Sequence, residues 1–242
     1  DVISFGNINS TDVTFTRDLN SAYGDLVISV NGTTDSVRLY AYYYTNVDTT
    51  AYANINLSFA DGVFYNRDDI RAHTNSDENI YGSDSDDTLY GGLGNDFLQG
   101  YGGADTYLFN RGDGQDYIDN GYADGIDTQD LISFGNINST DVTFTRDLNS
   151  AYGDLVISVN GTTDSVRLYA YYDGNVDTSA YANINLSFAD GVMYSRDDIR
   201  AHSYSNENIY GSDSDDTLYG GLGNDSLQAY GGADTYLFNR GD

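Results

Sequence analysis

The sequence predicts an all-β protein in which coils of very short strands alternate with small β modules. The coils are indicated by residues Gly82 to Leu108, which divide into three blocks of nine, GSDSDDTLY, GGLGNDFLQ and GYGGADTYL. Each block has Asp at its sixth place and a large apolar residue at its eighth. The modules are indicated by residues 1–65, where apolar and polar residues alternate as they do in half-buried strands. The whole pattern recurs 129 residues later, and such tandem similarity implies repeated structure.

The chain of 242 residues consists of one long period and most of a second. Asp1 matches Asp130, and 11 of the 113 overlapping positions differ. The second copy stops at Asp242, inside a motif that the first copy continues beyond Asp113. We therefore interpret the chain as a window onto a longer tandem array, with a trimmed segment as the alternative. The period predicts β modules at residues 1–73 and 130–202, and acidic, glycine-rich coils at residues 74–129 and 203–242, the last of them truncated.

The charge balance points to a protein that binds cations. The net charge is −28, because 38 acidic residues stand against 10 arginines and there is no lysine. A polyanion of this size repels itself in the compact state, so nucleic acid is not an expected partner and neither is an anionic membrane. The 24 tyrosines and 10 phenylalanines argue against disorder, and we expect the chain to fold once its charge is neutralised. There is no cysteine, which excludes disulfide and thiol chemistry, and no apolar run long enough to insert into a membrane.

The acidic turns favour calcium as the neutralising ion. The turn from Gly91 to Asp96 holds three glycines, which tolerate positive φ and close backbone approach. Only a very short strand can follow each turn, with Leu89 and Leu98 pointing into the coil. Stacked coils place one carboxylate over another, and a hard cation with oxygen ligands from Asp and backbone carbonyls would relieve the repulsion. Calcium suits such a site better than magnesium, and zinc is disfavoured by the absence of Cys and the single His of each repeat.

The blocks resemble the calcium-binding nonapeptide of the RTX (repeats-in-toxin) family, whose pattern is G-G-x-G-x-D-x-U-x. GGLGNDFLQ matches throughout, whereas GSDSDDTLY has Ser83 and Ser85 at two glycine places. Degenerate blocks flank the three, with Glu78 at the acidic place before them and Asp116 after them. The resemblance implies a parallel β-roll with two nonapeptides in each full coil and calcium between the turns on each edge.

The resemblance also implies which residues face one another and which hold calcium. Alternate blocks would share an edge, so that the facing pairs are Asp87 with Asp105, Asp96 with Asp116, and Asp216 with Asp234. The implied calcium-site residues are Asp84, Asp87, Gly91, Gly92, Gly94, Asp96, Gly102, Gly103, Asp105, Asp113 and Asp116, and, in the second copy, Asp213, Asp216, Gly220, Gly221, Gly223, Asp225, Gly231, Gly232 and Asp234.

The strand-rich half is predicted to be a β module with one short helix. A turn signal between Val30 and Val37 separates two strands, and NRDDIRAH predicts a brief helix capped by Asn66, or by Ser195 in the second copy. The stretches DVISFG, DLVISVNGTTDSVRL and LSFADGVFY resemble the "haemolysin-type calcium-binding protein related" module that occurs between RTX blocks. We interpret this half as a module that packs against, or continues, the roll.

Several further signals are given no functional role. YAYYY at Tyr40 to Tyr44 is interpreted as packing, with a sugar-binding or self-association strip as the alternative, because copy two has Asp173 in place of Tyr44. The RGD strings at residues 111–113 and 240–242 are interpreted as roll turns rather than integrin ligands. His73 and His202 are copies of one position, and no catalytic constellation emerges, so we do not expect an enzyme.

The expected function is structural: a calcium-binding repeat of a large secreted bacterial protein. Such a repeat would form a calcium-stiffened surface stalk, adhesin shaft or extracellular fibre, through self-association or further tandem repeats. Two alternatives stay open, a calcium-dependent carbohydrate-binding module with glycan partners and the export-and-folding tail of a secreted hydrolase or toxin. A glycan array would test the carbohydrate-binding module. An enzyme domain in the flanking sequence would support the export-and-folding tail.

Overall fold

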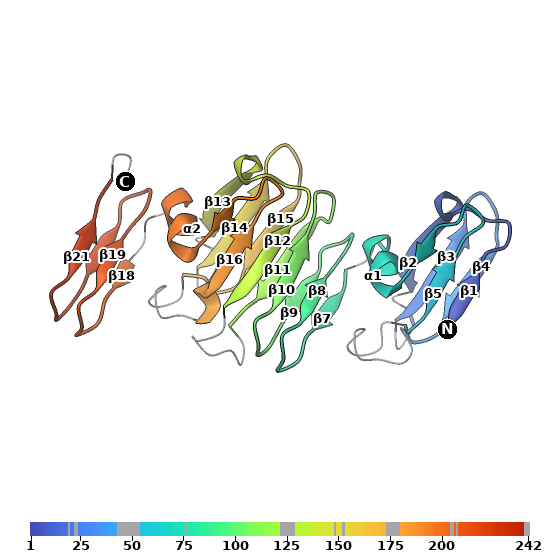
Figure 1. Ribbon diagram of the computed structural model, residues 1–242, viewed down its shortest axis with the longest axis horizontal. Coiled ribbons are helices and arrows are strands. Elements are labelled where there is room, and N and C mark those ends of the chain that lie inside the picture. The colour runs from blue at the N-terminus through green and yellow to red at the C-terminus, as the bar shows by residue number, and fades with distance from the viewer. Residues whose placement is uncertain are drawn as a thin grey trace.

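The all-β prediction is confirmed by a computed structural model, in which modules and rolls follow one another along the longest axis (Figure 1). A module is followed by a short helix and then by a roll, and the same order recurs in the second copy. The structure describes residues 1–18, 20–21, 24–42, 54–75, 77–121, 129–147, 149–151, 153–172, 180–203, 206 and 208–239.

The first module consists of two three-stranded sheets. In one sheet β1 and β5 are parallel and β5 and β6 are antiparallel, whereas β2, β3 and β4 form an antiparallel meander. Its strands are β1 (Val2–Ser4), β2 (Val13–Asp18), β3 (Asp25–Val30), β4 (Ser36–Leu39), β5 (Asn56–Ser58) and β6 (Phe64–Tyr65), with a short 3-10 helix at Ser10–Asp12. The second module repeats this with β12 (Asp130–Phe134), β13 (Val142–Asp147), β14 (Asp154–Val159), β15 (Ser165–Leu168), β16 (Ile184–Ser187) and β17 (Met193–Tyr194), and with 3-10 helices at Ser139–Asp141 and Ala180–Ala182.

The alternating residues of the module form its core, as the pattern predicts. Leu26 and Ile28 of β3 and Leu57 of β5 are fully buried between the two sheets. The predicted turn after Val30 is the hairpin loop between β3 and β4. The sheet pairing therefore buries one face of each strand and leaves the polar face outside.

The first roll is a parallel coil of the predicted kind. Strands β7, β9 and β11 pair in parallel on one wall, and β8 and β10 pair in parallel on the other. Tyr107 pairs with Leu89, 18 residues earlier, so that two nonapeptides make one full coil. Residues at the eighth place of each block, Leu89 and Leu98 among them, are buried in the middle. The strands are β7 (Asn79–Tyr81), β8 (Thr88–Tyr90), β9 (Phe97–Gln99), β10 (Thr106–Phe109) and β11 (Gln115–Asp119), and in the second copy β18 (Asn208–Tyr210), β19 (Thr217–Tyr219), β20 (Ser226–Gln228) and β21 (Thr235–Leu237).

The second module continues the first roll without a break. Strand β12 pairs in parallel with β10, and β15 pairs in parallel with β11. One wall thus becomes the five-stranded sheet β17-β16-β12-β10-β8, and the other becomes the six-stranded sheet β13-β14-β15-β11-β9-β7. One hydrophobic cluster, from Ile80 to Ile199, fills both units. The alternative that the module continues the roll, rather than only packing on it, is therefore confirmed.

Two short helices, α1 (Arg67–Ala72) and α2 (Arg196–His202), connect each module to the roll that follows. The predicted caps are confirmed, since the N–H of Asp69 donates to Oδ1 of Asn66 at 3.0 Å and Ser195 caps α2 in the same way. Arg71 is 2% exposed, and its Nη1 donates to the carbonyl oxygen of Tyr90 at 3.0 Å. This hydrogen bond connects α1 to β8, near the N-terminal end of the first roll.

Candidate calcium sites along the edges of the roll

The sixth-place acids form a ladder along one edge of the first roll. Each carboxylate accepts a hydrogen bond from the backbone N–H of the acid one coil earlier. The N–H of Asp87 donates to Oδ1 of Asp105 at 2.8 Å, so this predicted pair does face. The N–H of Asp105 donates in turn to Oδ1 of Asp130 at 2.6 Å, which extends the ladder into the second module.

The opposite edge carries a second ladder of the same kind. The N–H of Glu78 donates to Oδ1 of Asp96 at 2.7 Å, and the N–H of Asp96 donates to Oδ1 of Asp116 at 3.0 Å. The predicted pair of Asp96 and Asp116 is thereby found, and Glu78 takes the acidic place of the degenerate first block. Acid thus stands above acid on both edges, as the stacking argument requires.

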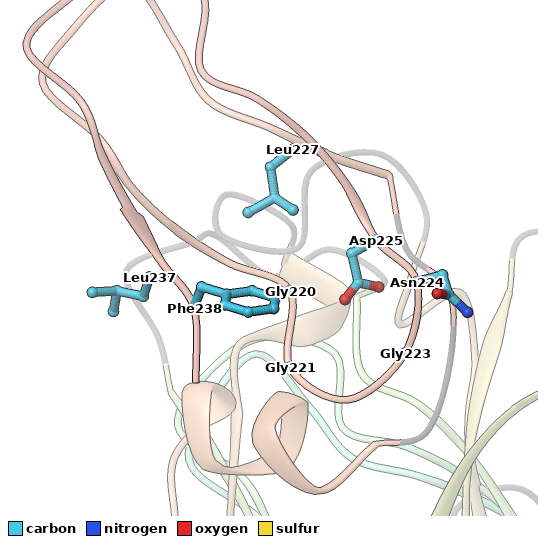
Figure 2. Close-up of a pocket in the computed structure, with 8 residues that line it drawn as sticks. All are labelled: Gly220, Gly221, Gly223, Asn224, Asp225, Leu227, Leu237 and Phe238. Atoms are coloured by element: carbon cyan, nitrogen blue, oxygen red, sulfur yellow. The ribbon is translucent and has the colours of Figure 1, made fainter. Parts of the chain in front are cut away.

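The second roll repeats the arrangement. The N–H of Asp216 donates to Oδ1 of Asp234 at 3.1 Å, the third predicted pair. Figure 2 shows the turn formed by Gly220, Gly221 and Gly223, with the carboxylate of Asp225 directed into it. The acid of each block therefore folds back over the glycines of its own turn.

The glycines are required because this backbone leaves no room for side chains. A Cβ on Gly91 would overlap the carboxylate of Asp96, and a Cβ on Gly92 would overlap the carbonyl oxygen of Arg71. A Cβ on Gly103 would lie 2.5 Å from the carbonyl carbon of Ser85, in the turn one coil earlier. The first glycine of a block thus makes space for the acid, and the later ones let neighbouring turns stack.

We expect Gly103→Ala to destabilise the roll more than Gly112→Ala. Both glycines have positive φ, +113° and +101°, so both variants carry the left-handed backbone cost of about 1–2 kcal/mol. Only Gly103 lies against another turn, whereas a Cβ on Gly112 would meet nothing within 4 Å. The clash adds about 1–3 kcal/mol, measurable as a difference in the free energy of unfolding by urea titration in calcium. Equal losses in the two variants would show that the turns are not stacked closely.

The carboxylates of the second edge are buried close together, which raises their pKa. Burial raises the pKa of Asp96 and that of Asp113 to about 6. Burial raises the pKa of Asp116 to about 9, and the neighbouring charges of Asp96, Asp113 and Asp164 add to the shift. At neutral pH the calcium-free fold therefore has to keep a proton on Asp116, which costs stability, whereas a bound cation would stabilise the charged forms of all three carboxylates.

The residues of these edges fit calcium. Oδ2 of Asp96 is buried and has no hydrogen-bond partner among the described residues. In the part of the chain that the structure describes, no group of three or more His, Asp or Glu side chains could hold a metal on its own. Most ligands would therefore be backbone carbonyls of the glycine turns, completed by one or two carboxylates. Such an all-oxygen set is one that calcium prefers.

The remaining predicted residues of the calcium sites differ in burial and in their position within the turns. Asp113 is 3% exposed and accepts from the N–H of Asn110 at 2.7 Å, inside the turn that precedes β11. Asp84 and Asp213 are exposed, and Asp213 lies next to Gly231 in the turn one coil later. Gly94, Gly102 and Gly103 of the first copy, with Gly223, Gly231 and Gly232 of the second, lie in the stacked turns. The list of ligands as a whole stays a prediction, and so do the four domain boundaries.

One set of edge residues was missed from the sequence. Acids and amides at the fifth place of the blocks make hydrogen bonds of the same kind on both edges. Beside the second ladder, Oδ1 of Asp77 accepts from the N–H of Asn95 at 2.8 Å. Beside the first ladder, Asp86 accepts in the same way from the N–H of Ala104 at 2.9 Å. The recurrence of Asp or Asn directly before the sixth-place acid was the signal that could have found them.

The signals given no functional role prove structural where the structure describes them. Tyr42 and Tyr171 are fully buried, as the packing interpretation expects, whereas Tyr40 is exposed and Tyr44 and Asp173 lie outside the described residues. Asp113 of the first RGD string is buried, and a buried carboxylate is not available to a receptor. The second string, 240–242, also lies outside the described residues. His73 stacks on Tyr65, with ring centroids 4.5 Å apart, so its role is packing.

Two family models match the chain. The model of the RTX calcium-binding nonapeptide repeat matches residues 74–107, 81–118 and 205–242. The model of the haemolysin-type calcium binding protein related domain matches residues 25–69 and 154–198. The comparison with curated proteins gave no match.

The parallel coil, its stacked glycine turns and its ladders of buried acid define a calcium-binding β-roll. Together the two matching models cover more than half of the chain, which belongs to the RTX family of haemolysin-type calcium-binding proteins. Its cofactor is Ca²⁺, and repeats of this kind occur in secreted bacterial proteins. Among the described residues, none of the helices has the length and apolar character needed to cross a membrane.

Proposed function

We propose that this chain is a structural segment of an extracellular stalk, adhesin shaft or fibre, stiffened by calcium. The observation that carries the proposal is the joint between the first roll and the second module. Both walls of the roll run on into the module, and one hydrophobic core fills both units. A joint made by two sheets at once resists bending, which is what a shaft requires of its repeats.

The first module presents the face that the second module buries in this joint. Val2 is 58% exposed in β1, whereas its counterpart Leu131 is half-buried against the roll. Tyr40 is 61% exposed, whereas its counterpart Tyr169 packs on Tyr117 of the roll with ring centroids 6.1 Å apart. Because the two modules are nearly identical in sequence, the exposed face is suited to the end of another roll. Repeats, in one chain or in several, would then stack head to tail in the manner of other solenoids.

Near-identical duplication favours a structural role over a catalytic one, since a shaft gains length from each added copy. The binding-module alternative loses support at Tyr42, Tyr171 and Tyr172, which are buried, and keeps only the exposed Tyr40 among the described tyrosines of the first stretch. The export-tail alternative predicts a catalytic domain in the flanking sequence, whereas the shaft predicts further 129-residue periods there.

The shaft is tested by the shape of the full chain in calcium and in EDTA. Small-angle X-ray scattering should give one elongated, rigid particle in millimolar calcium and a broad, expanded ensemble in EDTA. Electron microscopy of the native protein should show straight rods. Beads joined by flexible links in calcium would refute the shaft while leaving calcium binding intact.

A further inference from the structure

The acid ladder on the first edge continues past the last nonapeptide into the second module. Asp130 belongs to β12, yet its Oδ1 accepts from the N–H of Asp105 just as Oδ1 of Asp105 accepts from the N–H of Asp87. The two bonds are 2.6 and 2.8 Å long. Asp130 therefore takes the place of a sixth-place acid, although no nonapeptide directly precedes it in the sequence.

A module acid also reaches the last turn of the other edge. Asp164 lies in the loop before β15, and its Oδ2 accepts from the N–H of Gly112 at 2.7 Å. Gly112 belongs to the turn that ends at Asp116, and the Asp164 charge acts directly on that carboxylate. The same edge holds Oδ2 of Asp96, which is buried and unsatisfied by any described hydrogen-bond donor.

The first module gives the exposure of the two corresponding acids where no roll is paired with the module. Asp1 is the counterpart of Asp130 and is exposed, whereas Asp130 is 1% exposed. Asp35 is the counterpart of Asp164 and is also exposed, whereas Asp164 is 8% exposed. Docking of the module on the roll thus buries two further carboxylates beside the acidic residues of the two edges. Burial of charge is unfavourable unless an opposite charge compensates for it.

We propose that Asp130 and Asp164 belong to the calcium sites at the end of the first roll, one on each edge. The last turns of the roll would then share their calcium with the module, so that metal binding and module docking become one coupled event. Calcium would hold successive units of the chain together in addition to folding each roll. This inference rests on calcium binding by the roll. It goes beyond the proposed shaft, and a result that refuted the shaft would not contradict it.

The test compares each joint acid with its exposed counterpart in the same chain. Asp130→Asn removes the charge of the joint acid but keeps an oxygen that can accept from Asp105, and Asp1→Asn makes the same change outside the joint. In isothermal titration calorimetry with CaCl₂ we expect Asp130→Asn to lose one calcium, or to bind it on the order of tenfold more weakly. The Asp1→Asn variant should match the parent chain.

The second edge provides an independent pair, Asp164→Asn against Asp35→Asn, with the same expectation. Hydrogen exchange adds a readout of docking: the amides of β12 and β15 should gain less protection from calcium in the two joint variants than in the two controls. Unchanged calcium number, affinity and protection in both joint variants, with the parent binding calcium normally, would overturn the inference alone. A parent chain that binds no calcium would overturn the calcium assignment as well.

Discussion

Chelation of calcium with EDTA should abolish most of the β-sheet circular dichroism signal of this chain, and added calcium should restore it. The chain has a net charge of −28, and its rolls stack acid directly above acid. Buried carboxylates such as Asp116 have strongly raised pKa values, so their charged forms disfavour the calcium-free fold at neutral pH. Calcium reverses this balance, since the free energy of metal binding becomes free energy of folding.

The restoration should be selective for calcium. Magnesium at equal concentration should restore little of the signal, because it requires near-ideal octahedral geometry and gives up its water reluctantly. Hydrogen exchange should locate the change, with loss of protection in the roll strands β9 and β11. A spectrum that stays the same in EDTA and in calcium would contradict the metal-dependent fold.

The nine-residue spacing of Asp and of a large apolar residue was enough to predict stacked coils with an apolar core. The two blocks in each coil, and with them the facing of Asp96 with Asp116, came from the resemblance to the RTX nonapeptide. The hairpin between β3 and β4 and the cap at Asn66 follow equally from local turn and capping chemistry. These features depend on residues close in sequence, or related by a fixed period, and the sequence contains both.

The joint between roll and module could not be predicted in the same way. Asp130 lies 25 residues after Asp105, whereas the other ladder acids of the first roll are 18 or 20 residues apart, so the nine-residue blocks do not mark it. Asp164 contacts the turn at Gly112 from a hairpin loop that is exposed in the first copy. The module sequence is almost the same in both copies, and only docking on a roll distinguishes Asp130 from Asp1. Such a difference arises from tertiary context and leaves no local signal.

Asp96→Ala should weaken calcium binding far more than Asp12→Ala. Asp96 is 1% exposed, its Oδ1 accepts from the N–H of Glu78, and its Oδ2 lies over the glycines of its own turn. Its removal takes away a carboxylate of the second edge and leaves a buried N–H unpaired. We expect calcium affinity at that edge to fall by on the order of tenfold or more. The free energy of unfolding in calcium should fall by about 1–3 kcal/mol.

Asp12 is a demanding control because it is also an aspartate that accepts a backbone hydrogen bond, from the N–H of Asn9 at 3.1 Å. It lies in the exposed 3-10 helix of the first module, away from both ladders. Its replacement should cost less than about 1 kcal/mol and leave the calcium titration unchanged. If the two variants bound calcium equally well, the carboxylates of the ladder would not be the ligands, and the sites would have to be built from the turn carbonyls alone.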